Sequence, residues 1–418
     1  MAEQTFDFKI DLPREVQFAL EVLDKGGFKA YVVGGAVRDS LMGIKPHDFD
    51  VSSPSTPNQT MRLFPGYEIE RSGLKHGTVR VIIHHYPVEI TSFRTEDGYK
   101  DFRHPSEVSF ISSPFEDSKR RDFTINAFYY RDGKITDFHD GLTDLKDKVI
   151  RAIGNPEQRF KEDALRILRA LRFASELKFT IEPETKKAMA DCAEELFDIS
   201  EERIEGETLR MAAYDDFLNT VKDNRKVFSV IFQGSEKIPD DKLLSKTVND
   251  PYVNLAILLN LMDYDQKTAD ELLRKLKFSV LNGKAIESLL AIDRKWTLKS
   301  LLASTLSYRL FLLNTYPLNP ETALDFVYIR DAVNKQDLSY YDQAKDRLNE
   351  AEIGKAPVSK KDLMVTGNDL KHVGFKEGPE FKALMNELLL EVNQEKVGSG
   401  RKEQLDWLKK RRFEASHK

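Results

Sequence analysis

One change of pattern along the chain constrains its fold more than any other feature. Up to about residue 150, short runs rich in β-branched residues alternate with turns. From Pro156 onward, apolar residues recur at helical spacing almost to the end. The sequence therefore predicts an α+β fold, with a mixed-sheet N-terminal head followed by an all-helical remainder. The runs that we expect to form strands are 30–33, 49–51, 78–83 and 88–93.

Composition narrows the classes of protein to consider. A length of 418 residues suggests two to four domains, and a formal net charge of −5 excludes a bulk polycation. Any contact with nucleic acid therefore depends on local basic surfaces. The single cysteine, Cys192, excludes a disulfide framework and a cysteine-based zinc site. Neither a signal peptide nor a run of about 18 apolar residues is visible, so we expect a cytoplasmic protein without a membrane span.

The first chemical signal is a glycine pair at the end of a strand run. Gly34 and Gly35 follow Val33, and a helix-like segment begins there, with Arg38 about one turn further on. Glycine lets backbone N–H groups approach a phosphate closely, and a guanidinium can bind phosphate oxygens. A glycine pair alone more often marks a plain strand–turn–helix junction.

The second signal is a pair of carboxylates thirteen residues later. Asp48 and Asp50 flank Phe49, and residues two apart in a strand point to the same face. Two hard oxygen ligands side by side suit Mg²⁺, with substrate phosphates completing its shell. An isolated Asp-x-Asp is usually a solvated turn, but together with the glycine turn it forms a minimal set for nucleotidyl transfer. Glu89 is either a third carboxylate of this site or a surface residue.

These motifs resemble the nucleotidyltransferase superfamily that includes DNA polymerase β. More narrowly, the sequence is similar to class II tRNA nucleotidyltransferases (CCA-adding enzymes, Bacillus type) and the related bacterial poly(A) polymerases. The resemblance lies in Gly-Gly-x-x-Arg-Asp at 34–39, Asp-x-Asp at 48–50, the turn at 72–79, Arg-Arg-Asp-Phe-Thr-Ile-Asn-Ala at 120–127 and the hinge motif at 137–145. After Asp50 the family usually continues Ile-Ala-Thr, whereas this chain has Val-Ser-Ser.

The resemblance implies roles for these residues. Asp48 and Asp50 would be the catalytic ligands of Mg²⁺. The nucleotide-binding set in the head would be Gly34, Gly35, Arg38, Arg121, Asp122 and Asn126.

The stretch 162–173 predicts a helix on which Asp163, Arg166, Arg169 and Arg172 recur three residues apart. Without the resemblance, a surface helix with ion pairs is the commoner explanation of this pattern. In the family it is the Glu-Asp-x-x-Arg motif that reads the base. A carboxylate only accepts and a guanidinium only donates, which matches the amino group and ring nitrogen that cytosine and adenine share. Uracil and guanine would leave these groups unpaired, at about 1–3 kcal/mol each.

Two arginines of this helix and one later segment are further candidates for roles in the site. Arg169 and Arg172 are candidates for contacts to the triphosphate. The segment 199–204 resembles the family's last neck motif, although an ordinary helix start capped by Ser200 is equally compatible with it.

Two further segments separate the members of the family. The long, polar stretch from Phe93 to Asp117 predicts a mobile loop, which is shortened in enzymes that add only CC. The segment 365–391 is similar to the tail of Bacillus-type enzymes, and the basic helix near 401–412 suits contacts to an RNA backbone or a solvated helix end. No His-x-x-x-His-Asp run indicates a fused phosphohydrolase domain.

We therefore expect template-independent addition of C, C and A to the 3′ end of tRNA from CTP and ATP, with release of pyrophosphate. The alternatives are A-only addition, poly(A) synthesis, or a catalytically silent RNA-binding protein. The expected domains are a catalytic head at 1–151, a base-reading neck at 152–206, a helical body at 207–310 and a tRNA-binding tail at 311–418.

Overall fold

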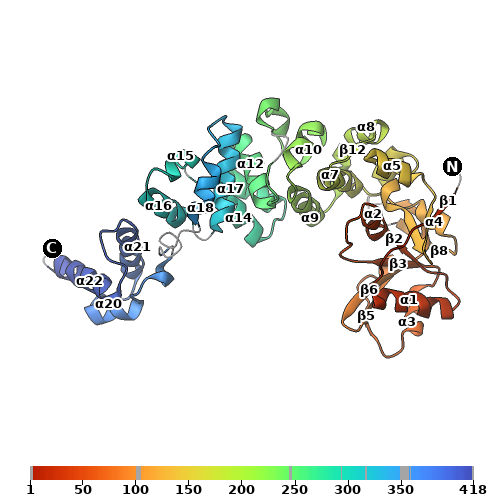
Figure 1. Ribbon diagram of the computed structural model, residues 1–418, viewed down its shortest axis with the longest axis horizontal. Coiled ribbons are helices and arrows are strands. Elements are labelled where there is room, and N and C mark those ends of the chain that lie inside the picture. Colours follow the sequence, from red (N-terminus) through yellow and green to blue (C-terminus); the bar gives the residue numbers. More distant parts are fainter. Residues whose placement is uncertain are drawn as a thin grey trace. The chain divides into compact units, whose positions relative to one another are not determined.

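A computed structural model of the chain consists of two compact units (Figure 1). Unit 1 comprises Met1–Met211 and Asp223–Glu236, and unit 2 comprises Ala212–Lys222 and Lys237–Lys418. The structure describes residues 3–99, 105–243, 247–292, 294–315, 318–348, 357 and 359–416. The expected α+β class is confirmed, because unit 1 contains a mixed eight-stranded sheet and the rest is mainly helical.

The four predicted strand runs form the centre of this sheet. The strand order is β1-β10-β9-β2-β3-β6-β5-β4, so the predicted runs lie side by side as β2, β3, β6 and β5. Only β3 and β6 pair in parallel, and the other neighbours are antiparallel. The strands are β1 (Gln4–Asp7), β2 (Tyr31–Val33), β3 (Asp50–Ser53), β4 (Glu68–Glu70), β5 (Thr78–Ile83), β6 (Tyr86–Ser92), β9 (Phe128–Arg131) and β10 (Lys134–Asp137).

The two faces of the sheet differ in chemistry. One row across the centre consists of Val32, Val51, Ile90 and Val79, which are all buried. The helices α1 (Arg14–Lys25) and α3 (Pro57–Leu63) pack against strands of this central region. The next row, one residue along, runs through Tyr129, Val33, Asp50, Glu89 and Arg80. Because successive side chains alternate between faces, the candidate site lies on the opposite face from the valine row.

The prediction of a loop between Phe93 and Asp117 is wrong for the part that the structure describes, whereas the mobility of this stretch stays a prediction. Strand β7 (Arg94–Tyr99) pairs antiparallel with β8 (Pro105–Phe110), and helix α4 (Pro114–Ser118) follows. Residues 100–104 lie outside the described residues. Backbone pairing needs no apolar alternation, so a polar two-stranded ribbon carries little of the signal that predicts a strand.

The predicted helix over 162–173 is interrupted. Helix α6 (Pro156–Glu162) ends before Asp163, whose φ of −145° and ψ of 100° are extended, and α7 (Leu165–Leu177) begins two residues later. The Asp163 carboxylate accepts a hydrogen bond from the backbone N–H of Leu165 at 3.1 Å. A short polar side chain that bonds to a nearby N–H favours a helix start over a helix interior, which explains the break.

Unit 1 also contains helices and short strands from both the head and the helical segments that follow it. They are α2 (Gly35–Leu41), α5 (Gly141–Asp147), β11 (Val149–Ile150), β12 (Thr180–Ile181), α8 (Pro183–Asp191), α9 (Glu201–Ala212) and α11 (Arg225–Ile231), where α9 reaches one residue into unit 2. Strand β11 pairs in parallel with β12, which places the segment after α5 beside the segment after α7.

The regular secondary structure in the described part of unit 2 is helical. The breaks expected near 232–251 and 314–320 are confirmed, because helices begin at Pro251 and Pro320. Of the break expected at 354–358, only Pro357 belongs to the described residues. The helices are α10 (Phe217–Asp223), α12 (Pro251–Leu261), α13 (Gln266–Lys275), α14 (Val280–Leu290), α15 (Leu298–Leu301), α16 (Thr305–Thr315), α17 (Pro320–Val333), α18 (Tyr341–Leu348), α20 (Gly367–Val373), α21 (Pro379–Asn393) and α22 (Arg401–Ser416).

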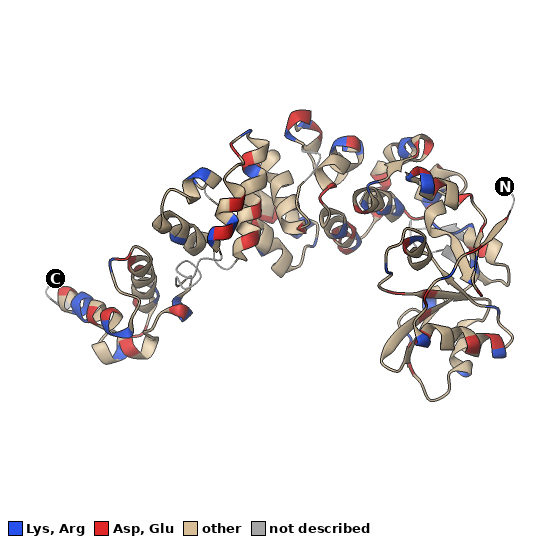
Figure 2. Ribbon diagram, viewed as in Figure 1, with Lys and Arg blue, Asp and Glu red and all other residues tan. Residues whose placement is uncertain are grey.

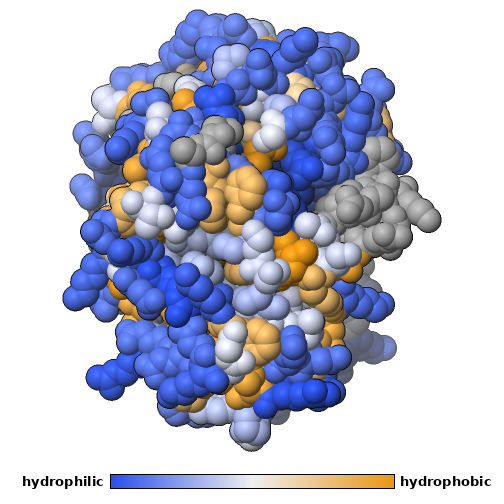
Figure 3. All heavy atoms as spheres, turned by 90° about the vertical axis from the view of Figure 1, so that its right-hand side faces the viewer, coloured by the Kyte–Doolittle hydropathy of each residue, from blue (hydrophilic) through white to orange (hydrophobic). Residues whose placement is uncertain are grey.

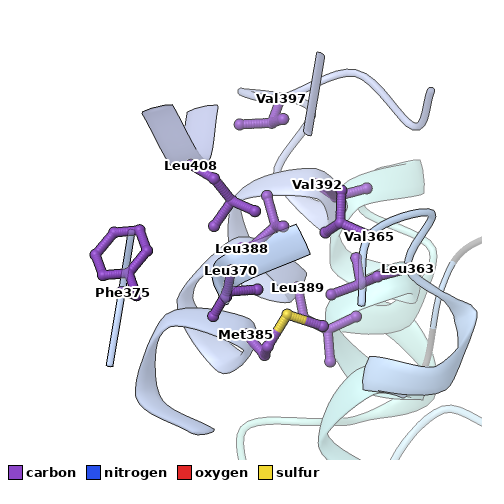
Figure 4. Close-up of a cluster of buried hydrophobic side chains, with 10 residues drawn as sticks. All are labelled: Leu363, Val365, Leu370, Phe375, Met385, Leu388, Leu389, Val392, Val397 and Leu408. Carbon is purple, nitrogen blue, oxygen red and sulfur yellow. The ribbon is translucent and has the colours of Figure 1, made fainter. Parts of the chain in front are cut away.

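The last three helices share a compact apolar cluster (Figure 4). Leu388 of α21, Leu370 of α20 and Leu408 of α22 are fully buried in it. No helix among the described residues is long and apolar enough to cross a membrane.

Charged side chains of both signs are intermixed along the helices of both units (Figure 2). The face shown in Figure 3 is mostly hydrophilic, and its apolar residues occur in small scattered groups. The net charge of the chain is therefore a poor guide to any single surface.

Candidate active site

One cleft of unit 1, about 990 Å³ in volume, is lined by every site residue that the sequence predicts. Elements from both the sheet and the neck contribute to it, so residues far apart in the sequence face the same space. The predicted residues in its lining are Gly34, Gly35, Arg38, Asp48, Asp50, Arg121, Asp122, Asn126, Asp163, Arg166, Arg169 and Arg172.

Asp50 is the first residue of β3, and Asp48 lies two residues before it. Asp48 and Asp50 are exposed to the cleft, and Phe49 between them is buried, as the alternation of a strand requires. Desolvation, together with the neighbouring charges of Glu89 and Asp48, raises the pKa of Asp50 to about 6. A bound divalent cation would relieve the same repulsion, so this donor set fits a hard metal ion.

Glu89 lies beside Asp50 in the sheet but is engaged by an arginine. Its carboxylate accepts from Arg80 Nε at 3.0 Å, and Arg80 also donates to Glu70 at 3.0 Å. Among the described residues, no three metal-ligating side chains of the His, Cys, Asp and Glu types are grouped as a metal site. The candidate ligands are therefore the pair Asp48 and Asp50.

The glycine turn adopts a conformation that side chains disfavour. Gly34 has φ 74° and ψ −140°, and α2 starts at the next residue. Arg38 of α2 is buried, and its Nη1 donates to Asn126 Oδ1 at 2.8 Å while its Nε donates to Asp39 at 2.8 Å. The other polar atom of Asn126, Nδ2, is buried without a partner among the described residues. Asn126 thus holds Arg38 and keeps one donor available.

Arg121 is held by three side chains from other parts of unit 1. Its Nε donates to the Tyr129 hydroxyl at 3.0 Å, and its Nη2 donates to Ser52 Oγ at 3.1 Å and to Asp117 Oδ2 at 3.4 Å. Burial lowers the pKa of Arg121, but Tyr129 and Asp117 outweigh this effect and raise it above its usual range. The guanidinium therefore stays charged, in a fixed orientation.

Arg169 and Arg172 are each paired with a carboxylate. Arg169 Nε donates to Asp122 at 2.8 Å, which raises the pKa of Arg169. Arg172 Nε donates to Glu207 at 2.8 Å and its Nη1 donates to Glu176 at 2.9 Å.

An aromatic ring joins the arginines of the head and the neck. Three guanidinium carbons lie near the Phe173 ring centroid, with Arg172 at 4.1 Å, Arg38 at 5.1 Å and Arg169 at 5.5 Å. Distances below about 6 Å are those of cation–π interactions. Phe173 therefore acts as a shared platform for three cations of the cleft.

The expected base-reading residues are held by different partners. Asp163 Oδ2 accepts from Arg203 Nη2 at 2.9 Å. Arg166 Nη2 donates to the Arg120 carbonyl at 2.8 Å, and its Nη1 donates to Glu162 at 2.9 Å. Both side chains line the cleft, and each is oriented by hydrogen bonds within the chain.

Sequence reasoning missed several residues that orient the predicted ones. Asp117, Tyr129 and Phe173 carry no motif of their own, although Asp117 lies three and four residues before two arginines, a spacing that predicts ion pairs on a helix. The pairing of Tyr129 with β2 and of Glu207 with Arg172 depends on tertiary contacts that no local pattern indicates.

Comparison with known proteins finds three family models and several curated relatives that match the chain. Residues 30–151 match the family model "Poly A polymerase head domain", residues 178–224 match "Probable RNA and SrmB- binding site of polymerase A", and residues 247–408 match a model of tRNA nucleotidyltransferase domain 2. The CCA-adding enzyme of Lacticaseibacillus paracasei is 35% identical over 399 residues, which cover 91% of each chain. That of Streptococcus mutans is 51% identical over 209 residues, which cover 49% of this chain and 52% of the other.

A solved structure resembles the whole chain. The crystal structure of Bacillus stearothermophilus CCA-adding enzyme in complex with CTP matches with a TM-score of 0.75 and 27% identity. The match covers 97% of this chain and 98% of the other.

Proposed function

The chain belongs to the family of CCA-adding enzymes, and we propose that it adds C, C and A to the 3′ end of tRNA from CTP and ATP, without a nucleic-acid template. The reaction is an attack of the tRNA 3′-hydroxyl on the α-phosphate of the nucleotide, with pyrophosphate as the leaving group. The observation that most directly supports this proposal is the single cleft that contains a carboxylate pair, several oriented arginines and the Asp163–Arg166 pair.

Nucleotidyltransferases of this kind generally depend on a divalent metal ion, and we propose Mg²⁺, held by Asp48 and Asp50. When bound, the ion would supply Lewis-acid activation and charge neutralisation at the reacting phosphate. The chain itself contributes two carboxylates that are exposed to the cleft and crowded enough to raise the pKa of Asp50 to about 6. A cation that binds both carboxylates replaces this repulsion with attraction.

The head would hold the sugar and the triphosphate. Arg38 and Arg121 are oriented by buried partners, so little conformational entropy is lost when they bind a ligand. Asn126 Nδ2 offers a donor without a partner in the described part of the chain. Gly34 and Gly35 keep side chains out of the turn that leads into α2. Arg169 and Arg172 would extend this basic wall from the neck.

The neck would select the base. Asp163 accepts from the amino group of cytosine or adenine, and Arg166 donates to the adjacent ring nitrogen. The break before α7 supports this role, because it frees Asp163 from the helix surface and directs one of its oxygens to Leu165 N–H and the other to Arg203. A fixed carboxylate and a fixed guanidinium discriminate better than mobile ones, since a mismatched base finds no alternative partner.

The division into head (1–151), neck (152–206), body (207–310) and tail (311–418) and the cytoplasmic location form part of the same proposal. The tail would contact the tRNA backbone through the basic residues of α22, which carries Arg401, Lys402 and the run Lys409–Arg412.

Extension of a defined tRNA tests the proposal. With tRNA that lacks CCA, Mg²⁺, CTP and ATP, we expect a gain of three nucleotides, and UTP or GTP should not replace them. Addition of A alone or of long A tracts would assign the chain to the A-only or poly(A) alternative. Binding of tRNA without any extension would support a silent RNA-binding protein.

A further inference from the structure

Asp117 does not line the cleft, but its carboxylate accepts hydrogen bonds from several residues around it. It lies in α4 and is fully buried. Its Oδ2 accepts from the Tyr129 hydroxyl at 2.6 Å and from Arg121 Nη2 at 3.4 Å. Its Oδ1 accepts from Arg120 Nε at 2.8 Å and from the backbone N–H of Arg94 at 3.1 Å. One buried carboxylate thus joins α4 to the base of the β7–β8 hairpin, to β9 and to both arginines at 120 and 121.

The contacts of Asp117 lead to two different parts of the cleft. Arg121 presents its Nη1 toward the glycine turn, since a Cβ on Gly34 would lie 3.8 Å from that atom. The backbone carbonyl of Arg120 accepts from Arg166 Nη2 at 2.8 Å. A shift of the 120–121 segment would therefore move the phosphate wall and the base-reading guanidinium together.

The negative charge of Asp117, as well as its hydrogen bonds, holds the neighbouring arginines. Burial raises the pKa of Asp117, but Arg120, Arg121 and the Tyr129 hydroxyl outweigh burial and lower it below its usual value. The carboxylate is therefore ionised at neutral pH and balances the two arginines. Loss of this charge would leave a buried guanidinium without its counter-charge, which favours rearrangement of the side chain.

We propose that Asp117 is a positioning residue of the nucleotidyl-transfer reaction, which orients Arg121 directly and Arg166 through the Arg120 carbonyl. The proposal rests on the function proposed above. Because the triphosphate is common to CTP and ATP, displacement of Arg121 should weaken the binding of both nucleotides equally.

Kinetics of single additions test this role. The variants are Asp117→Asn, which removes the charge, and Tyr129→Phe, which removes one donor to Asp117 and one acceptor for Arg121 but keeps the ring in its aromatic cluster. The matched control is Asp331→Asn in unit 2, where a buried carboxylate accepts from the Leu298 N–H at 2.8 Å. CMP addition to tRNA without CCA and AMP addition to tRNA ending in CC are measured separately.

We expect Asp117→Asn to raise KM for CTP and for ATP about tenfold, a factor that corresponds to about 1.4 kcal/mol. Tyr129→Phe should also raise both KM values. In both variants, kcat should change less than KM. Asp331→Asn should lower the thermal midpoint without a change in KM. Wild-type KM values in Asp117→Asn and Tyr129→Phe would overturn the proposal, and Tyr129→Phe decides if Asp117→Asn does not fold. If the wild-type chain itself fails to extend tRNA, the proposed function fails, and this inference fails with it.

Discussion

Replacement of Gly34 by alanine would test the turn at which β2 leads into the cleft. Gly34 has φ 74° and ψ −140°, a combination that residues with a Cβ atom rarely adopt. An alanine held in such a conformation is strained by on the order of 1–3 kcal/mol. Among the described residues beyond its two chain neighbours, Arg121 Nη1 is the one atom near the added methyl group, at the ordinary contact distance of 3.8 Å. The predicted loss of stability therefore comes almost entirely from the backbone.

The adjacent glycine provides a matched control. A Cβ on Gly35 would also meet one guanidinium atom, Arg38 Nη2, at 3.8 Å, but Gly35 has no positive φ and begins helix α2. Since alanine favours a helix over glycine, Gly35→Ala should be neutral or stabilising by up to about 1 kcal/mol.

Calorimetry of the full chain measures the difference between the two variants. At roughly 2–4 °C per kcal/mol for a domain of 150–250 residues, the transition of unit 1 should fall by about 2–12 °C in Gly34→Ala. The same transition should stay constant or rise in Gly35→Ala. Equal transition temperatures in the two variants would refute the argument from backbone strain, whatever happens to activity.

Three other predictions follow from the site and from the tail. Asp48→Ala should abolish tRNA extension and leave tRNA binding largely intact, and a chelator should stop the wild-type reaction until excess Mg²⁺ is added; extension that persists in chelator contradicts the metal assignment. Asp163→Ala should increase incorporation of UTP and GTP relative to CTP and ATP, and unchanged selectivity would count against base reading by this residue. Leu388→Ala, which empties a fully buried position of the tail cluster, should lower the free energy of unfolding by about 2–5 kcal/mol. Leu390→Ala, at a position 40% exposed on the same helix, should change it by only about 0.5 kcal/mol, and equal losses would contradict the packing argument.

Four adjoining strands of the sheet could be predicted from the sequence, whereas β1, β4, β9 and β10 could not. Strands β2, β3, β5 and β6 contain β-branched residues that are buried on at least one face, and burial produces the pattern that predicts a strand. The edge strands β1 and β4 are short and largely exposed, and their residues show no such pattern. The β7–β8 hairpin is held by backbone pairing of polar segments, so its composition indicated a loop instead.

The site residues could be predicted as a set, but the way in which they are held could not. The motifs identified the side chains that line the cleft, because binding of phosphates and bases requires particular residue types. The spacing of Asp163 and Arg166 suggested one continuous helix, and only the side-chain bond to Leu165 N–H explains why the helix breaks there. Partners such as Asp117, Glu207 and Phe173 act through contacts between distant segments, and a single sequence does not record which segments meet.

The balance of charges in the cleft bears on how a nucleotide is recognised. The lining contains eight arginines and seven Asp or Glu residues, so their charges almost cancel. Arg169 and Arg172 are each paired with carboxylates, so the cleft is not a region of strong positive field. Attraction of a triphosphate then depends on donors in fixed directions, and a divalent cation at Asp48 and Asp50 would supply two further positive charges where phosphates meet the sheet. Recognition by oriented pairs, not by bulk charge, is consistent with a chain whose net charge is −5 and whose proposed partner is an RNA.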